Sequence, residues 1–181
     1  YLNKHDDSSG AGFKAYVRGS YQATDGFREN SAIQQTSVYA GLSHESEKGY
    51  FKLFGFLGRE KSQSAYYAVE PEILEEDIRF NPLTPDDRDR FGQQFVQAQY
   101  THLAGTSTTL TAQAYYNGAQ GWFRIWDGGR ENLQQFGIDG HFVGLVVGAT
   151  HRAGSLALNW GGHANDFTRD AVRRDDADRC G

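Results

Sequence analysis

The 181-residue sequence is poor in several residues that mark soluble secreted proteins and membrane helices. It has one cysteine, three prolines and no methionine, and it contains no run of eighteen apolar residues. The single cysteine, Cys180, excludes an intramolecular disulfide and leaves the redox compartment open. The missing apolar run excludes a membrane-spanning helix. A membrane-spanning strand needs only about 9 to 11 residues with every second one apolar, and that possibility stays open.

Positive charge and a leader segment are also lacking. The formal net charge is -5, and no basic stripe runs along the sequence. That balance argues against a general nucleic-acid binder, which needs cations for the phosphates. The sequence opens with Tyr1-Leu2-Asn3 and shows neither an initiating methionine nor a signal peptide. We therefore expect an excerpt of a longer precursor.

Aromatic residues and glycine are what the sequence has in abundance. Aromatics make up 14% of the chain and there are 22 glycines, while apolar residues together reach only 38%. Tyr and Phe favour strands, and a low apolar content suits strands with one apolar and one polar face. The composition therefore predicts an all-β protein without a large two-sided core.

Alternation of apolar and polar residues predicts seven strands. In one of them Val96, Ala98 and Tyr100 alternate with Gln97 and Gln99, which places the two sets on opposite faces of the strand. The expected strands cover residues 12–22, 33–44, 50–59, 91–102, 108–117, 141–151 and 156–165.

The connections between these strands alternate in length. Short turns are expected at residues 45–49, 103–107 and 152–155, and longer loops at 23–32, 60–90 and 118–140. Such alternation is typical of an antiparallel up-and-down transmembrane β-barrel, with its turns on the periplasmic side. Seven is an odd number, so this barrel segment should not close alone. A soluble antiparallel β-domain that binds a ligand through its long loops and a small complete outer-membrane barrel remain alternatives.

A membrane barrel also predicts which face each side chain takes, because its apolar residues point outward to lipid. The apolar residues expected on the convex face are Val96, Ala98, Tyr100, Leu110, Ala112, Ala114, Tyr116, Leu158 and Trp160. The polar residues expected on the concave face are Gln97, Gln99, Thr111, Gln113 and Asn159.

Three stretches resemble the barrel of TonB-dependent outer-membrane receptors. They are Tyr21-Gln22-Ala23-Thr24-Asp25-Gly26-Phe27-Arg28-Glu29-Asn30-Ser31, the pair of segments at residues 97–100 and 110–117, and residues 161–167. The resemblance implies part of a 22-stranded, plugged barrel in the outer membrane of a Gram-negative bacterium. It also implies uptake of a scarce nutrient such as a ferric siderophore, with lipid and lipopolysaccharide as surroundings and TonB acting through a plug domain not recognisable here.

The resemblance suggests a division of the chain into three parts. Residues 1–11 are expected to be a lead-in, 12–168 a partial receptor-like barrel, and 169–181 a charged tail or truncated loop. The imported solute itself is not specified by the sequence.

Candidate ligand-binding residues come from the expected loops, where exposed aromatics and arginine commonly anchor ligands. They are Trp122, Phe123, Arg124, Trp126, Tyr66, Tyr67 and Arg28. The aromatics in residues 120–127 could instead pack their own loop or form an outer aromatic girdle.

No catalytic residue, metal site or cofactor is expected. The histidines lack metal-ligand spacing, and His44, His102 and His151 flank the short turns, where an interfacial polar ring is the simpler role. Residues 60–90 hold nine acidic and four basic residues. Pairs such as Glu75-Glu76 and Asp86-Asp87 are interpreted as solvated loop charge, which would favour a cationic or neutral ligand or simply aid solubility.

Overall fold

The structure is a computed structural model that describes residues 12–65, 67–127 and 132–176. It contains seven strands and one short helix in these ranges. They are β1 (Gly12–Thr24), β2 (Ile33–Ser46), β3 (Gly49–Gln63), α1 (Pro71–Glu76), β4 (Arg88–Ala104), β5 (Thr108–Asp127), β6 (Asn132–Ala153) and β7 (Leu156–Asp176). None of the described helical structure is long and apolar enough to cross a membrane.

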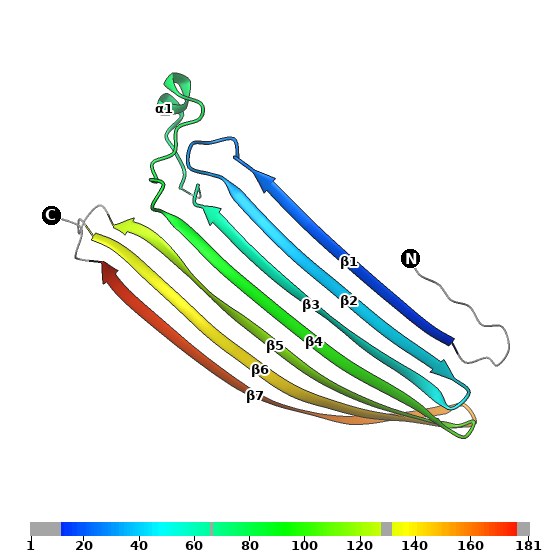
Figure 1. Cartoon of the computed structure of the whole chain (residues 1–181). Coiled ribbons are helices and arrows are strands. Elements are labelled where there is room, and N and C mark those ends of the chain that lie inside the picture. Colours follow the sequence, from blue (N-terminus) through cyan, green and yellow to red (C-terminus); the bar gives the residue numbers. More distant parts are fainter. Residues whose placement is uncertain (1–11, 66, 128–131, 177–181) are drawn as a thin grey trace.

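The strands form one antiparallel sheet in which each strand pairs with its neighbours in the sequence. The order is β1-β2-β3-β4-β5-β6-β7, so the described strands leave β1 and β7 as open edges. The predicted all-β, antiparallel, up-and-down topology is confirmed, and the sheet is long, curved and open (Figure 1).

Tight turns join β2 to β3, β4 to β5, and β6 to β7, as predicted. Gly105 and Gly154 have φ values of 73° and 62°, a left-handed conformation that glycine adopts without the steric penalty of a Cβ atom. These turns lie at one end of the sheet, which we call the turn end. The β1–β2 and β3–β4 connections, the second of which contains α1, lie at the opposite end, which we call the loop end (Figure 1).

Strand lengths correct the predicted loops. The predicted loop at 118–140 is wrong, because β5 and β6 pair without interruption from Thr108↔His151 to Asp127↔Asn132. Glycines within that stretch interrupt the side-chain alternation without interrupting the backbone pairing. The predicted loop at 60–90 shortens to residues 64–87. β7 also continues past Thr168, so residues 169–176 belong to the sheet, although their high charge had suggested a tail or truncated loop.

Register defines two faces of the sheet, because directly opposed residues of antiparallel strands project to the same side. The face in register with Leu53 is rich in Val, Leu and Ala and is called the aliphatic face. The face in register with Phe95 is called the aromatic face. One row across it reads Tyr39, Phe56, Phe95, Asn117, Phe142 and Phe167.

The nine apolar residues predicted to share one face all lie on the aliphatic face, and the five polar residues all lie on the aromatic face. On β6, Val143, Leu145 and Val147 are 45%, 49% and 45% exposed, whereas Phe142 and Val146, which project to the aromatic face, are only partly exposed. Side chains converge on the inside of a curved sheet. The more crowded aromatic face is therefore the concave one.

The described part of the protein has almost no apolar core. Leu83 is the one apolar side chain there that is buried, at 5% exposure. Soluble domains normally bury a sheet face against a second layer. The described residues form a single sheet with no second layer over its aliphatic face.

Candidate functional site

The aromatic cluster predicted in residues 120–127 is not a loop cluster but part of strand β5. Trp122, Arg124 and Trp126 alternate onto the aliphatic face near the loop end. The Arg124 guanidinium carbon lies 5.0 Å from the Trp122 ring centroid, and Arg124 Nε donates to Gln135 Oε1 at 2.7 Å. Arg124 is thus held in place by its own sheet.

Phe123 lies on the opposite, aromatic face. Its ring stacks on Phe136 with centroids 5.0 Å apart, and the Arg173 guanidinium carbon lies 5.7 Å from the Phe136 ring centroid. Strand alternation therefore divides the predicted ligand-binding aromatics between the two sides of the sheet. They cannot contact one ligand together.

The remaining predicted residues belong to the loops. Arg28 Nη1 donates to the carbonyl oxygens of Ala65 at 3.3 Å and Tyr67 at 2.8 Å. Tyr67 is 46% exposed, and Tyr66 lies outside the described residues. Because the Arg28 guanidinium is used to join two loops, its structural role is clear and a ligand-binding role is not needed to explain it.

A buried carboxylate holds the β3–β4 loop against the end of β5. Asp87 is 0% exposed. Its Oδ2 accepts hydrogen bonds from Thr84 N at 2.7 Å and Thr84 Oγ1 at 2.8 Å, and its Oδ1 accepts one from Trp126 N at 2.5 Å. Solvated loop charge was therefore the wrong interpretation for Asp87, although its neighbour Asp86 is exposed.

Amide side chains connect the β1–β2 loop to the β3–β4 loop. Asn81 Nδ2 donates to the carbonyl oxygens of Glu29 at 2.7 Å and Ser64 at 2.9 Å. Asn30 Nδ2 donates to the carbonyl oxygen of Leu83 at 3.0 Å. We call residues 25–32, 64–65 and 67–87 the loop assembly, since these bonds and those of Arg28 and Asp87 make it one unit.

A cavity of about 690 Å³ opens on the concave, aromatic face toward the loop end. Ligand pockets usually measure about 300 to 1,000 Å³. Arg18 and Glu60 place opposite charges in its lining, and Gln35 Nε2 donates to Glu60 Oε2. The lining residues that project to this face are Arg18, Ser20, Gln22, Gln35, Ser37, Phe56, Gly58, Glu60, Phe91, Gln93 and Ala119.

This concave-face cavity combines charged groups, amides and hydroxyls with two phenylalanine rings. Such a mixture suits reversible binding of a polar solute that carries some apolar surface. The cavity residues were missed because candidates were sought in loops. The sequence feature that could have indicated them is the row of polar residues on one side of each strand, such as Ser20 and Gln22 on β1 and Gln93 on β4.

The histidines of the described ranges do not gather into a site. No group of three or more His, Cys, Asp or Glu residues in the described ranges is placed to hold a metal ion. His44 and His102 lie on the aliphatic face near the turn end, where His44 stacks on Phe13 at 4.3 Å and His102 on Tyr100 at 6.1 Å. Their rings therefore join aromatic pairs along the turn-end edge.

Comparison with characterised proteins assigns neither a family nor a function to the chain. The chain has no significant match among protein-family models, curated proteins or solved structures.

Proposed function

We propose that the seven strands form part of the wall of an outer-membrane β-barrel that takes up a polar solute, in the manner of TonB-dependent receptors. The observation that carries the proposal is the aliphatic face, which is exposed although it is apolar. Leu145, Leu158 and Trp160 on it are 49%, 50% and 58% exposed. A continuous apolar surface of this kind marks contact with a membrane or another protein.

The position of the apolar segment on each strand favours lipid as the cover. On β2 it comprises Val38, Ala40 and Leu42, and its centre, Ala40, is in register through the intervening strands with Asp166 on β7. On β7 the apolar segment is instead centred on Trp160, six residues away. The apolar band thus crosses the sheet diagonally.

The diagonal gives the angle at which the strands would tilt. Six residues at about 3.3 Å each make about 20 Å, and five inter-strand spacings of about 4.8 Å make about 24 Å. Their ratio corresponds to a tilt of about 40°, and strands of membrane barrels tilt by about 35 to 45°. A second protein layer has no reason to require this slope.

The height of the band agrees with a membrane. On β6 it lies between His141 and His151, and ten residues at about 3.3 Å, tilted by about 40°, span about 25 Å. The apolar band of outer-membrane barrels is about 25 Å tall and is bordered by aromatic residues. Tyr116 stacks on His141 at 6.1 Å at the loop-end border, and Phe13 and Tyr100 mark the turn-end border.

Solute uptake is supported by the other face. The concave-face cavity lies next to the loop assembly, on the side that would face the barrel interior. TonB dependence and a ferric siderophore as solute follow from the resemblance of residues 21–31, 97–100, 110–117 and 161–167 to TonB-dependent receptors. Open edges at β1 and β7 would pair with further strands in the membrane, because unpaired backbone groups are costly in lipid.

The membrane proposal is tested by adjacent cysteines on β6. In a Cys180→Ser background, Leu145→Cys and Val146→Cys are labelled with a fluorophore and the full chain is folded into vesicles containing lipids brominated on their acyl chains. Because successive strand residues point to opposite faces, the probe at 145 should be strongly quenched and the probe at 146 weakly. Equal quenching, or quenching at neither position in a folded sheet, would refute the proposal and favour a soluble β-domain.

A further inference from the structure

Basic side chains gather just beyond the loop-end border of the apolar band. Arg59 and Lys61 on β3, Arg88 and Arg90 on β4, and Arg124 on β5 all project to the aliphatic face. We call these five residues the basic cluster. Their combined positive charge contrasts with the net charge of -5 for the whole chain.

The acidic residues next to them in the sequence do not neutralise this cluster. Glu60 and Asp89 point to the opposite face, where Glu60 accepts from Gln35 and Asp89 Oδ1 accepts from Ser62 Oγ at 2.6 Å. Within the described part of the chain, Arg59, Lys61 and Arg90 form no ion pair with a carboxylate. Lys61 and Arg90 are directly opposed across the β3–β4 pair. Like charges in such positions destabilise a sheet unless an anion lies between them.

The basic cluster borders a hollow on the aliphatic face. A cavity of about 460 Å³ is lined by Arg59, Lys61 and Arg90 on one side and by Gln120, Trp122 and Asp139 on the other. The Arg90 guanidinium carbon lies 5.8 Å from the Trp122 ring centroid. That contact orients Arg90 toward the hollow while leaving its N–H groups available for a ligand.

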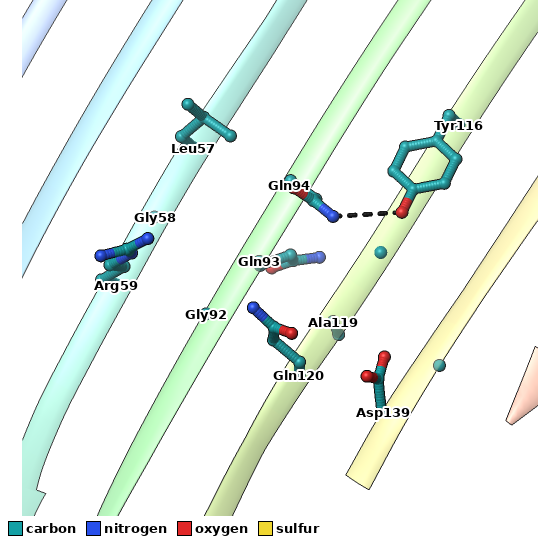
Figure 2. A pocket seen from close by; sticks show the side chains of 12 residues that line it. Leu57, Gly58, Arg59, Gly92, Gln93, Gln94, Tyr116, Ala119, Gln120 and Asp139 are labelled. Carbon is teal, nitrogen blue, oxygen red and sulfur yellow. Dashed lines mark hydrogen bonds between the residues drawn. The ribbon is translucent and has the colours of Figure 1, made fainter. Parts of the chain in front are cut away.

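Figure 2 shows the adjoining part of this hollow. Arg59 stands on one side, and Gln120 and Asp139 stand on the other. In register, Gly92 of β4 lies between Arg59 and Gln120, so no β4 side chain on this face separates them. Toward the apolar band, Gln94 Nε2 donates to Tyr116 Oη at 3.1 Å, and Leu57 follows on β3. A ligand in the hollow would therefore contact cations at one end and apolar side chains at the other.

We propose that this hollow binds the phosphorylated sugar headgroup of a membrane glycolipid. Guanidinium groups bind phosphate oxygens bidentately, and the unpaired Arg59 and Arg90 are placed to do so. Gln120 and Asp139 offer partners for sugar hydroxyls. Acyl chains attached to such a headgroup would continue onto the apolar band, and this continuity favours a lipid over a soluble phosphate. The inference rests on the proposed membrane location.

The test uses the full chain in phosphatidylcholine vesicles that contain bisphosphorylated lipid A. The triple variant Arg59→Gln/Lys61→Gln/Arg90→Gln is compared with the matched control Lys14→Gln/Lys52→Gln/Arg169→Gln, which removes three cations from the aromatic face. Each lipid-bound cation contributes about fivefold in affinity. The cluster variant should therefore bind lipid A about 100-fold more weakly than the wild type, and the control should match the wild type.

Two further arms identify what is recognised. Lipid A stripped of its phosphates should bind to the wild type as weakly as intact lipid A binds to the cluster variant, and millimolar inorganic phosphate should not compete. Competition by inorganic phosphate would show that the hollow recognises a soluble anion and not a lipid. Equally weak binding by the control variant would show that only the overall charge of the protein matters. Either result overturns the proposal.

The fluorescent probe at position 145 separates this inference from the proposed function. A quenched probe combined with phosphate-independent lipid binding would overturn the headgroup site alone. An unquenched probe would overturn the membrane location and the headgroup site together. Circular dichroism on each variant shows that the β-sheet has formed.

Discussion

Replacing Asp87 should release the loop assembly from the sheet without unfolding the strands. The carboxylate is fully buried and accepts hydrogen bonds from Thr84 N, Thr84 Oγ1 and Trp126 N. Asp87→Ala removes all three acceptor contacts. Since β3 and β4 are joined by a continuous ladder from Gly49↔His102 to Gln63↔Arg88, the strands themselves keep their pairing.

The size of the effect follows from the donors that are left without partners. A hydrogen bond to a charged group contributes about 1.5 to 3 kcal/mol. Three such bonds would sum to more, but they share one carboxylate and the Thr84 groups can regain water, so their effects are not additive. We expect the free energy of opening the loop assembly to fall by about 3 to 5 kcal/mol.

Hydrogen exchange of the full chain measures this opening directly. A loss of about 3 kcal/mol should accelerate exchange of the Trp126 and Thr84 amides at least about 100-fold, and proteolysis within residues 67–80 should become faster. Asp86→Asn is the matched control, because Asp86 is exposed and its side chain makes no hydrogen bond in the described part of the chain. Unchanged exchange in Asp87→Ala, or equal acceleration in both variants, would refute the assigned role.

Two smaller perturbations test the sheet and the cavity. Gly55→Ala would place a Cβ atom 2.5 Å from the Phe95 carbonyl oxygen, and it should lower the free energy of unfolding in urea by about 1 to 3 kcal/mol. The control Gly58→Ala lies on the same strand, and its Cβ atom would meet nothing within 4 Å, so it should cost far less. Equal losses of unfolding free energy in the two variants would contradict the close approach at Gly55. Arg18→Ala should weaken binding of a polar solute about tenfold in fluorescence titrations with ferric siderophores, cobalamin and oligosaccharides, and unaltered affinity relative to Lys14→Ala would place solute recognition outside the concave-face cavity.

The strand pattern was predictable because strand alternation is a local property. Residues such as Val96 and Gln97 report their faces directly, since neighbouring residues of a strand point to opposite sides. The three tight turns were also predictable, as glycines such as Gly105 and Gly154 tolerate the left-handed backbone that a turn requires.

The loop-end half of the β5–β6 hairpin was not predictable in the same way. Gly118, Gly121, Gly137 and Gly140 break the apolar alternation there, and local alternation was the only available signal for a strand. Pairing with a neighbouring strand decides whether such a stretch is extended, and that pairing involves residues far apart in the sequence.

The candidate residues show the same division. Sequence reasoning selected Trp122, Phe123 and Arg124 as neighbours in a loop, where all three could contact one ligand. Because they lie on strand β5, Phe123 projects to the opposite face from Trp122 and Arg124. Conversely, the residues of the concave-face cavity come from five strands, and only the register brings Arg18, Glu60 and Gln93 to one place.

The sequence by itself determined the fold class, the strand order and the apolar face, because alternation and turn chemistry act over a few residues. Only the tertiary structure decided the slope of the apolar band, the burial of Asp87 and the meeting of Lys61 with Arg90. Each of these depends on cross-strand register, and in an antiparallel sheet a shift of one residue moves every side chain to the other face. Charges that are dispersed or balanced along the chain, as in residues 59–61 and 88–90, therefore become a one-sided basic cluster only after folding.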